Sequence, residues 1–256
     1  MIFESHAHYD DEEFDADREE LLTSLAGHGI GLVINVGASM AGSEATVRLT
    51  EQYPFLYGAV GVHPSEVAEL DEEKLERLRV LCGCEKIVAV GEMGLDYHYP
   101  EPAVSLQKEW FERQLTLARE VKLPVIIHSR EAAKDTLDIM QVNHAGEIGG
   151  VVHCYSYTKE MAREYLNMDY YFGIGGVITF KNAKKLKEAV EYIPLDKILL
   201  ETDSPYLSPE PHRGERNSSL NLPYVAEAVA ELKGISYEEV IEATERNAKR
   251  LFGLQV

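Results

Sequence analysis

The feature that most constrains the fold is a regular alternation of short apolar runs with longer amphipathic stretches. The runs are rich in β-branched residues, and eight of them follow one another along the 256-residue chain. Nearly continuous apolar strands of this kind are typical of a parallel sheet that is covered by helices on its faces. The predicted strands are Ile2–Ser5, Gly31–Val36, Leu56–Val62, Ile87–Gly91, Pro124–Ile127, Gly150–Val152, Tyr170–Gly175 and Lys197–Leu200.

The stretches between the runs have the spacing of amphipathic helices. Four of them are Asp17–His28, Ser105–Val121, Ala132–Val142 and Lys181–Tyr192. Eight strand–helix units in about this length predict an α/β fold, a closed (β/α)8 barrel of the TIM type. An open doubly wound sheet is the alternative, but the Gly-rich phosphate loop that normally follows its first strand is absent from this sequence.

The last part of the chain follows a different pattern. A long loop rich in Pro, Gly and Ser spans Ser204–Pro223, and two closing helices follow it. The second of these begins at Ser236, where Ser236 and Glu239 have the spacing of a capping box. Because the sequence contains no linker or low-complexity tract, we expect residues 1–256 to form a single domain.

Composition excludes several classes of protein. The formal net charge of −19 argues against nonspecific coating of nucleic acid, which depends on Lys and Arg. No apolar run has the length of a membrane span, and the first residues lack the pattern of a signal peptide. The three cysteines, Cys82, Cys84 and Cys154, do not suggest a disulfide framework. We therefore expect a cytoplasmic protein that needs neither a membrane nor an obligate protein partner.

Polar residues that can bind metal follow six of the predicted strands, at the carboxyl ends where barrel enzymes place their catalytic groups. The first strand leads into His6-Ala7-His8, and His6 and His8 share a face because strand side chains alternate. The other ends carry His63, the segment Gly91–Asp96, His128, His153, and Glu201 with Asp203.

A lone histidine at such a position is more often a hydrogen-bonded polar residue than a ligand. A whole set of buried histidines and carboxylates, however, would be costly without a partner, and a divalent metal supplies one. We expect the ligands to be His6, His8, Glu92, His128, His153 and Asp203. Ligands of this kind without cysteine suit Zn²⁺ or Mn²⁺, and Mg²⁺ if water completes its shell. Their number exceeds one tetrahedral site, so we predict two ions with Glu92 reaching both.

The same motifs, taken together and in this order, resemble the TatD family of metal-dependent deoxyribonucleases, which is related to the amidohydrolase barrels. The resemblance spans essentially the whole chain and includes Gly61-Val-His63-Pro64, His128-Ser-Arg130, Glu201-Thr-Asp203-Ser-Pro205 and Arg213-Gly214. It implies the same six metal ligands. One departure is that the chain reads Asn217-Ser-Ser where the family often has Asn-Glu-Pro.

Roles at the site follow from residue chemistry. We expect Asp203 to bind one ion and accept a proton from the nucleophilic water, with Glu92 as the other catalytic carboxylate; an N-cap is the alternative for Asp203. Glu201 would orient an imidazole or be a structural carboxylate. His63, Arg130 and Arg213 are the expected phosphate contacts, the alternatives for the two arginines being a surface ion pair and a solvated loop charge.

The predicted function is metal-dependent hydrolysis of phosphodiester bonds. Only the family resemblance implies that the substrate is DNA, as ends or single strands, and that the enzyme is a 3'-5' exodeoxyribonuclease. A first alternative is an amide, ester or lactone hydrolase, because the fold does not choose the substrate. A second is a metal-binding scaffold without activity, although six ligands at an open barrel mouth are more than a closed structural site needs.

Overall fold

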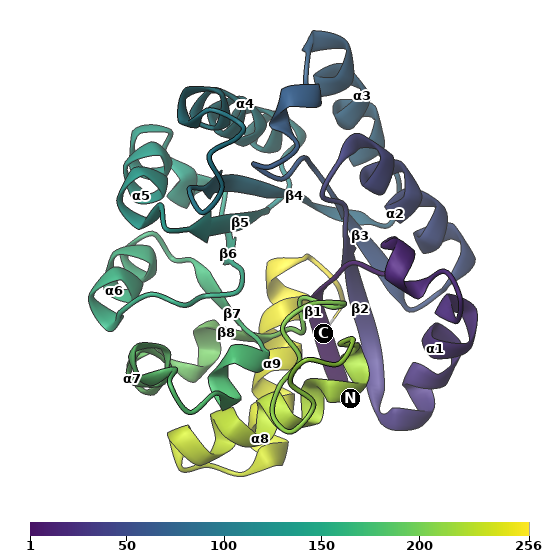
Figure 1. Cartoon of the computed structure of the whole chain (residues 1–256), viewed down its shortest axis with the longest axis vertical. Coiled ribbons are helices and arrows are strands. Elements are labelled where there is room, and N and C mark those ends of the chain that lie inside the picture. Colours follow the sequence, from purple (N-terminus) through teal and green to yellow (C-terminus); the bar gives the residue numbers. More distant parts are fainter. Residues whose placement is uncertain (256) are drawn as a thin grey trace. The chain divides into compact units, whose positions relative to one another are not determined.

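Eight strands lie in one sheet in the order of the sequence, from β1 to β8 (Figure 1). The computed structural model describes residues 1–255. The strands are β1 (Ile2–Ala7), β2 (Ile30–Val36), β3 (Leu56–Val60), β4 (Ile87–Asp96), β5 (Val125–Arg130), β6 (Gly150–Val152), β7 (Tyr171–Ile174) and β8 (Ile198–Leu200). This order, with a helix after every strand, confirms the (β/α)8 barrel of the TIM type.

Helices alternate with the strands, and two helices follow the last strand, β8. They are α1 (Arg18–Ser24), α2 (Met40–Gln52), α3 (Glu72–Cys82), α4 (Val104–Val121), α5 (Ala133–Val142), α6 (Lys159–Asn167), α7 (Lys184–Tyr192), α8 (Leu222–Lys233) and α9 (Tyr237–Leu251). In the part of the chain that the structure describes, none of these helices combines the length and the apolar character needed to cross a membrane.

Contacts along the chain divide it into two units. The terminal unit comprises Met1–Asn35, Cys154–Arg163 and the residues from Tyr171 onward, and the central unit comprises Val36–His153 and Glu164–Tyr170. Each unit has its own set of buried apolar side chains. That residues 1–256 form one domain stays a prediction.

In the terminal unit, the first and last strands are neighbours. Ala7 pairs with Ser204 in parallel register, and the His8 amide donates to the Ser204 carbonyl at 2.8 Å. Helix α9 packs on both β1 and β8, and Phe3 stacks on Phe252 with ring centroids 6.2 Å apart. The predicted capping box of Ser236 and Glu239 is present at the start of α9. The register between β1 and the chain after β8 therefore fixes how His6 and His8 stand beside Asp203.

In the central unit, β4 and β5 are longer than the sequence predicts. Strand β4 continues past Gly91 to Asp96, and β5 continues past Ile127 to Arg130. The two strands pair along this extension, with Gly94 opposite His128. The predicted ends came too early because Glu92, Gly94 and Asp96 interrupt the apolar run in β4, and His128–Arg130 are polar in β5. Backbone pairing between neighbouring strands does not depend on side-chain polarity.

Other predicted bounds shift by a few residues. The strand predicted over Leu56–Val62 ends at Val60, and the helix predicted over Asp17–His28 is α1 followed by a 3₁₀ helix over Leu25–His28. The predicted loop Ser204–Pro223 ends earlier, because α8 begins at Leu222 with Pro223 in its first turn. Proline is tolerated there because the first helical amides have no intrahelical acceptor.

Candidate active site

Three donor atoms converge in the terminal unit. The Nε2 atoms of His6 and His8 lie 3.1 Å apart, and Asp203 Oδ1 lies 3.6 Å from His6 Nε2 and 3.3 Å from His8 Nε2. His6 is fully buried and His8 is 8% exposed. We call these residues the His6 group; their spacing is that of a group that could hold a metal ion.

The local backbone explains why these three side chains meet. His6 lies one residue before the end of the buried strand β1, and His8 follows two residues later on the same face, as the alternation of strand side chains predicts. Asp203 lies just after β8 with φ at +58°, a left-handed conformation that Asp tolerates better than most residues. Its amide donates to the His6 carbonyl at 3.0 Å, which places the carboxylate beside the two imidazoles.

A second set of donors meets in the central unit. Glu92 Oε1 lies 2.8 Å from His128 Nδ1 and 2.6 Å from His153 Nε2, and these two nitrogens are 3.1 Å apart. We call Glu92, His128 and His153 the Glu92 group. Burial alone would raise the pKa of Glu92, but His153, His63 and His128 hold that pKa well below its usual value. The carboxylate is therefore ionised and available as a ligand.

Asp96 is a neighbour of this group for which no role was predicted from the sequence. Its Oδ2 lies 3.1 Å from His128 Nε2, on the ring edge opposite Glu92. Its backbone is fixed by Gln107, whose side chain accepts from the Asp96 amide and donates to the Asp96 carbonyl, both at 2.9 Å. A carboxylate on one ring nitrogen orients a metal-binding histidine and leaves its other nitrogen to the metal. The regular spacing of Glu92, Gly94 and Asp96 on one strand face was the available signal.

His63 lies beside the Glu92 group. Its Nε2 is 3.8 Å from Glu92 Oε1, and its ring meets that of His128 edge-on with centroids 4.3 Å apart. The Ser65 amide donates to His63 Nδ1 at 3.1 Å, so the ring proton is on Nε2. Burial, reinforced by His128, lowers the pKa of His63 to about 3, which leaves the ring neutral. One ring nitrogen of His63 also lies close enough to ligand atoms of Glu92 and His128 for these three residues to hold a metal ion.

Glu201 is held in place by the terminal unit. Its carboxylate is 1% exposed, and its Oε1 accepts from the Cys154 amide at 2.5 Å. Strand β7 leaves room for it at Gly173, where a Cβ would come within 2.0 Å of Glu201 Oε2. The expected role of Glu201 in orienting an imidazole stays a prediction.

The two expected phosphate-binding arginines are exposed and rest on aromatic rings. The Arg130 guanidinium lies over Tyr99 at 5.8 Å in the central unit, and the Arg213 guanidinium lies over Phe180 at 4.3 Å in the terminal unit. Among the residues that the structure describes, neither forms an ion pair with a carboxylate, unlike Arg216, which binds Asp17 at 2.6 Å.

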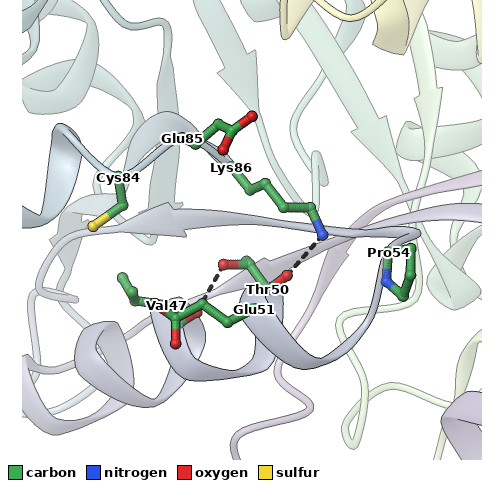
Figure 2. A pocket seen from close by; sticks show the side chains of 7 residues that line it. All are labelled: Val47, Thr50, Glu51, Pro54, Cys84, Glu85 and Lys86. Carbon is green, nitrogen blue, oxygen red and sulfur yellow. Dashed lines mark hydrogen bonds between the residues drawn. The ribbon is translucent and has the colours of Figure 1, made fainter.

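A pocket of about 470 Å³ lies elsewhere in the central unit (Figure 2). It is lined by residues that include Thr50, Cys84, Glu85 and Lys86. Lys86 precedes β4, whereas Glu92 is on the carboxyl-terminal half of that strand. The Lys86 ammonium donates to the carbonyls of Thr50 and Tyr53 at 2.7 and 2.6 Å, so it caps the end of α2. Lys86 is therefore a structural cation at the edge of this pocket.

The donor sets fit divalent metal. In each group two imidazole nitrogens lie 3.1 Å apart beside a carboxylate oxygen, and a shared cation relieves the crowding of such lone pairs. Imidazole and carboxylate ligands suit Zn²⁺ and Mn²⁺ and accept Mg²⁺ with water. A (β/α)8 barrel with such groups at the carboxyl ends of its strands defines a metal-dependent hydrolase.

Comparison with known proteins identifies the family. The family described as TatD related DNase matches residues 3–253. The chain is 43% identical over 252 residues to the uncharacterized metal-dependent hydrolase YabD of Bacillus subtilis (strain 168), covering 98% of this chain and 99% of the relative. It is 33% identical over 246 residues to the 3'-5' ssDNA/RNA exonuclease TatD of Cronobacter sakazakii, covering 94% and 93%. The chain belongs to the TatD family of metal-dependent hydrolases.

A solved structure supports the same conclusion. The crystal structure of YjjV, a TatD homologue from Escherichia coli K12, superposes with a TM-score of 0.94 at 30% sequence identity. The match covers 99% of this chain and 98% of that chain. The resemblance drawn from the sequence motifs is therefore confirmed in family and in fold.

Proposed function

We propose that this hydrolase uses two divalent cations to cleave phosphodiester bonds of DNA from the 3' end. The observation that carries the proposal is the convergence of two donor sets, each of two imidazoles and one carboxylate. The proposed ligands are His6, His8 and Asp203 for one ion and Glu92, His128 and His153 for the other. That Glu92 serves both ions stays a prediction from the sequence.

The chain's own residues have distinct proposed roles. Bound cations would lower the pKa of a water molecule and polarise a phosphoryl oxygen. Asp203 Oδ1 would accept the proton of the attacking water, because it is an ionisable oxygen beside two histidines. His63 would donate a hydrogen bond from its Nε2–H to a non-bridging phosphate oxygen, which agrees with the tautomer that Ser65 sets. Arg130 and Arg213 would bind further phosphate oxygens, each in its own unit.

DNA as substrate is supported by the relative from Cronobacter sakazakii, whose name describes a 3'-5' ssDNA/RNA exonuclease. The acidic net charge of −19 favours a few local phosphate contacts over a broad basic surface. We propose the cytoplasm as the compartment, because the three cysteines are free thiols.

The test is cleavage of single-stranded DNA by purified protein that has been stripped of metal and then supplied with Mg²⁺, Mn²⁺ or Zn²⁺. Strands labelled at the 5' end should shorten progressively, whereas strands labelled at the 3' end should release the label at once. A 5'-labelled RNA of the same sequence measures the preference for sugar. No cleavage with any cation, together with turnover of a lactone or an amide, would replace the proposal with the hydrolase alternative.

A further inference from the structure

A buried carboxylate that the proposed reaction does not use lies on β1. Glu4 is fully buried, two residues before His6 on the same strand. Burying a carboxylate without hydrogen-bond partners is unfavourable, so the arrangement around Glu4 needs an explanation. The sequence signal is slight: one acidic residue within an apolar run that leads into His6-Ala7-His8.

Four hydrogen bonds reach the Glu4 carboxylate. Its Oε1 accepts from the amides of His6 at 3.2 Å and Thr202 at 2.9 Å. Its Oε2 accepts from the hydroxyls of Thr202 at 2.7 Å and Ser219 at 2.9 Å. No cation is among these partners, so Glu4 acts as an acceptor that joins three segments of the terminal unit.

Two of those segments carry the His6 group. Thr202 directly precedes Asp203, whose left-handed backbone must be held by its neighbours. We propose that Glu4 is a positioning residue: by tying the backbone of His6 to that of Thr202, it sets the spacing of the His6 and Asp203 side chains for cation binding. This inference rests on the proposed function only in taking the His6 group as a cation site.

The third segment explains what the chain does where the family often has Asn-Glu-Pro. Ser219 Oγ accepts from the Tyr9 hydroxyl at 2.7 Å, and the Ser219 amide donates to the same hydroxyl oxygen at 3.0 Å. The Asn217 side chain donates to the Thr202 carbonyl at 2.9 Å. Asn217 and Ser219 are fully buried, so they brace the strand ends from inside.

The experiment is calorimetric titration of the metal-stripped full chain with Mn²⁺, comparing the wild type with Glu4→Ala and Glu4→Gln. Loss of partners that orient metal ligands typically weakens affinity about 10–100-fold, and we expect a loss of that order for Glu4→Ala in one class of site. The other class, identified as the one removed by His128→Ala, should keep its Kd. Glu4→Gln should stay within about threefold of wild type, because its oxygen can accept from both amides and its NH₂ can donate to the two hydroxyls.

Two further variants keep the test decisive. Thr202→Val removes one donor without removing Glu4, and it should weaken the same class of site by at least about threefold even if Glu4→Ala does not fold. Thr244→Ala deletes a buried hydroxyl that donates within α9 at 2.8 Å, so it controls for loss of stability alone and should leave both Kd values unchanged.

Unchanged Mn²⁺ affinity in folded Glu4→Ala, or in Thr202→Val, would overturn the inference. A tenfold loss in Glu4→Gln as well would assign the effect to charge and overturn positioning. If the wild type binds Mn²⁺ with this pattern but cleaves no DNA, the proposed substrate fails while the role of Glu4 stands. If the wild type binds no cation, both fail.

Discussion

Asp203 carries two proposed tasks on one carboxylate, cation binding and proton acceptance. Asp203→Asn keeps the shape of the side chain and one ligand oxygen but removes the charge and the proton acceptor. Because a general base contributes about 10²–10⁴-fold, we expect single-turnover cleavage at saturating metal to slow by at least that order. Substrate affinity should change far less. A rate within threefold of wild type would remove Asp203 from the mechanism.

His128 tests the division between ligands and phosphate contacts. His128→Ala should lower the bound metal per chain, because it deletes one of the nitrogens that meet Glu92 Oε1. The fold should persist, since barrel stability resides mainly away from the catalytic face. Arg130→Ala is the matched control from the same strand, and it should weaken DNA binding while metal content stays unchanged. Elemental analysis of both folded variants checks this, and loss of metal in Arg130→Ala would contradict the assignment.

The candidate ligands were easier to predict from the sequence than the residues that hold them in place. His6, His8 and Asp203 were proposed from their places at strand ends, and the structure brings them together in the terminal unit. Asp96 and Glu4 were given no role, because their alternation with candidate ligands along a strand does not show which groups they contact. Their partners, His128 Nε2 and the Thr202 amide, are close only once the strands have paired.

At the scale of elements, the Glu201 carboxylate just after β8 occupies the space that Gly173 on β7 leaves by having no side chain. A Cβ at position 173 would meet Glu201 Oε2 at 2.0 Å and Cδ at 2.5 Å. Gly173→Ala should therefore lower the free energy of unfolding by about 1–3 kcal/mol through overpacking. Gly27→Ala is the control, because a Cβ there meets nothing within 4 Å. Urea titrations that give both variants the same midpoint would contradict this matching.

The periodicity of the sequence predicted the strands and helices but not the residues at which they end. Each of the eight predicted apolar runs contains a strand, because the apolar character that buries a run belongs to its own residues and does not depend on which strand it pairs with. The ends of β4 and β5 depend on pairing such as Gly94 with His128, which a window of hydropathy does not contain. Leu25, the buried residue of the 3₁₀ helix over Leu25–His28, follows Leu21 and Leu22 at helical spacing, so periodicity alone did not separate this segment from α1.

At the scale of the whole molecule, cations should stabilise both units, because the His6 group belongs to the terminal unit and the Glu92 group to the central unit. A ligand that binds only the folded state at 100 times its Kd adds about 2.7 kcal/mol. If residues 1–256 unfold as one domain, scanning calorimetry should show one transition. Mn²⁺ should raise the temperature of that transition through the stabilisation from both cation sites together.

Variants at each group separate these contributions. His8→Ala should remove the stabilisation by Mn²⁺ bound at the His6 group, and His128→Ala should remove that by Mn²⁺ bound at the Glu92 group. The double variant should unfold at the same temperature with Mn²⁺ or with a chelator. Two transitions, each shifted by a different single variant, would contradict the single domain while supporting both cation sites. A shift that survives in the double variant would show that the stabilising cation binds elsewhere, and it would remove both groups from the proposed metal centre.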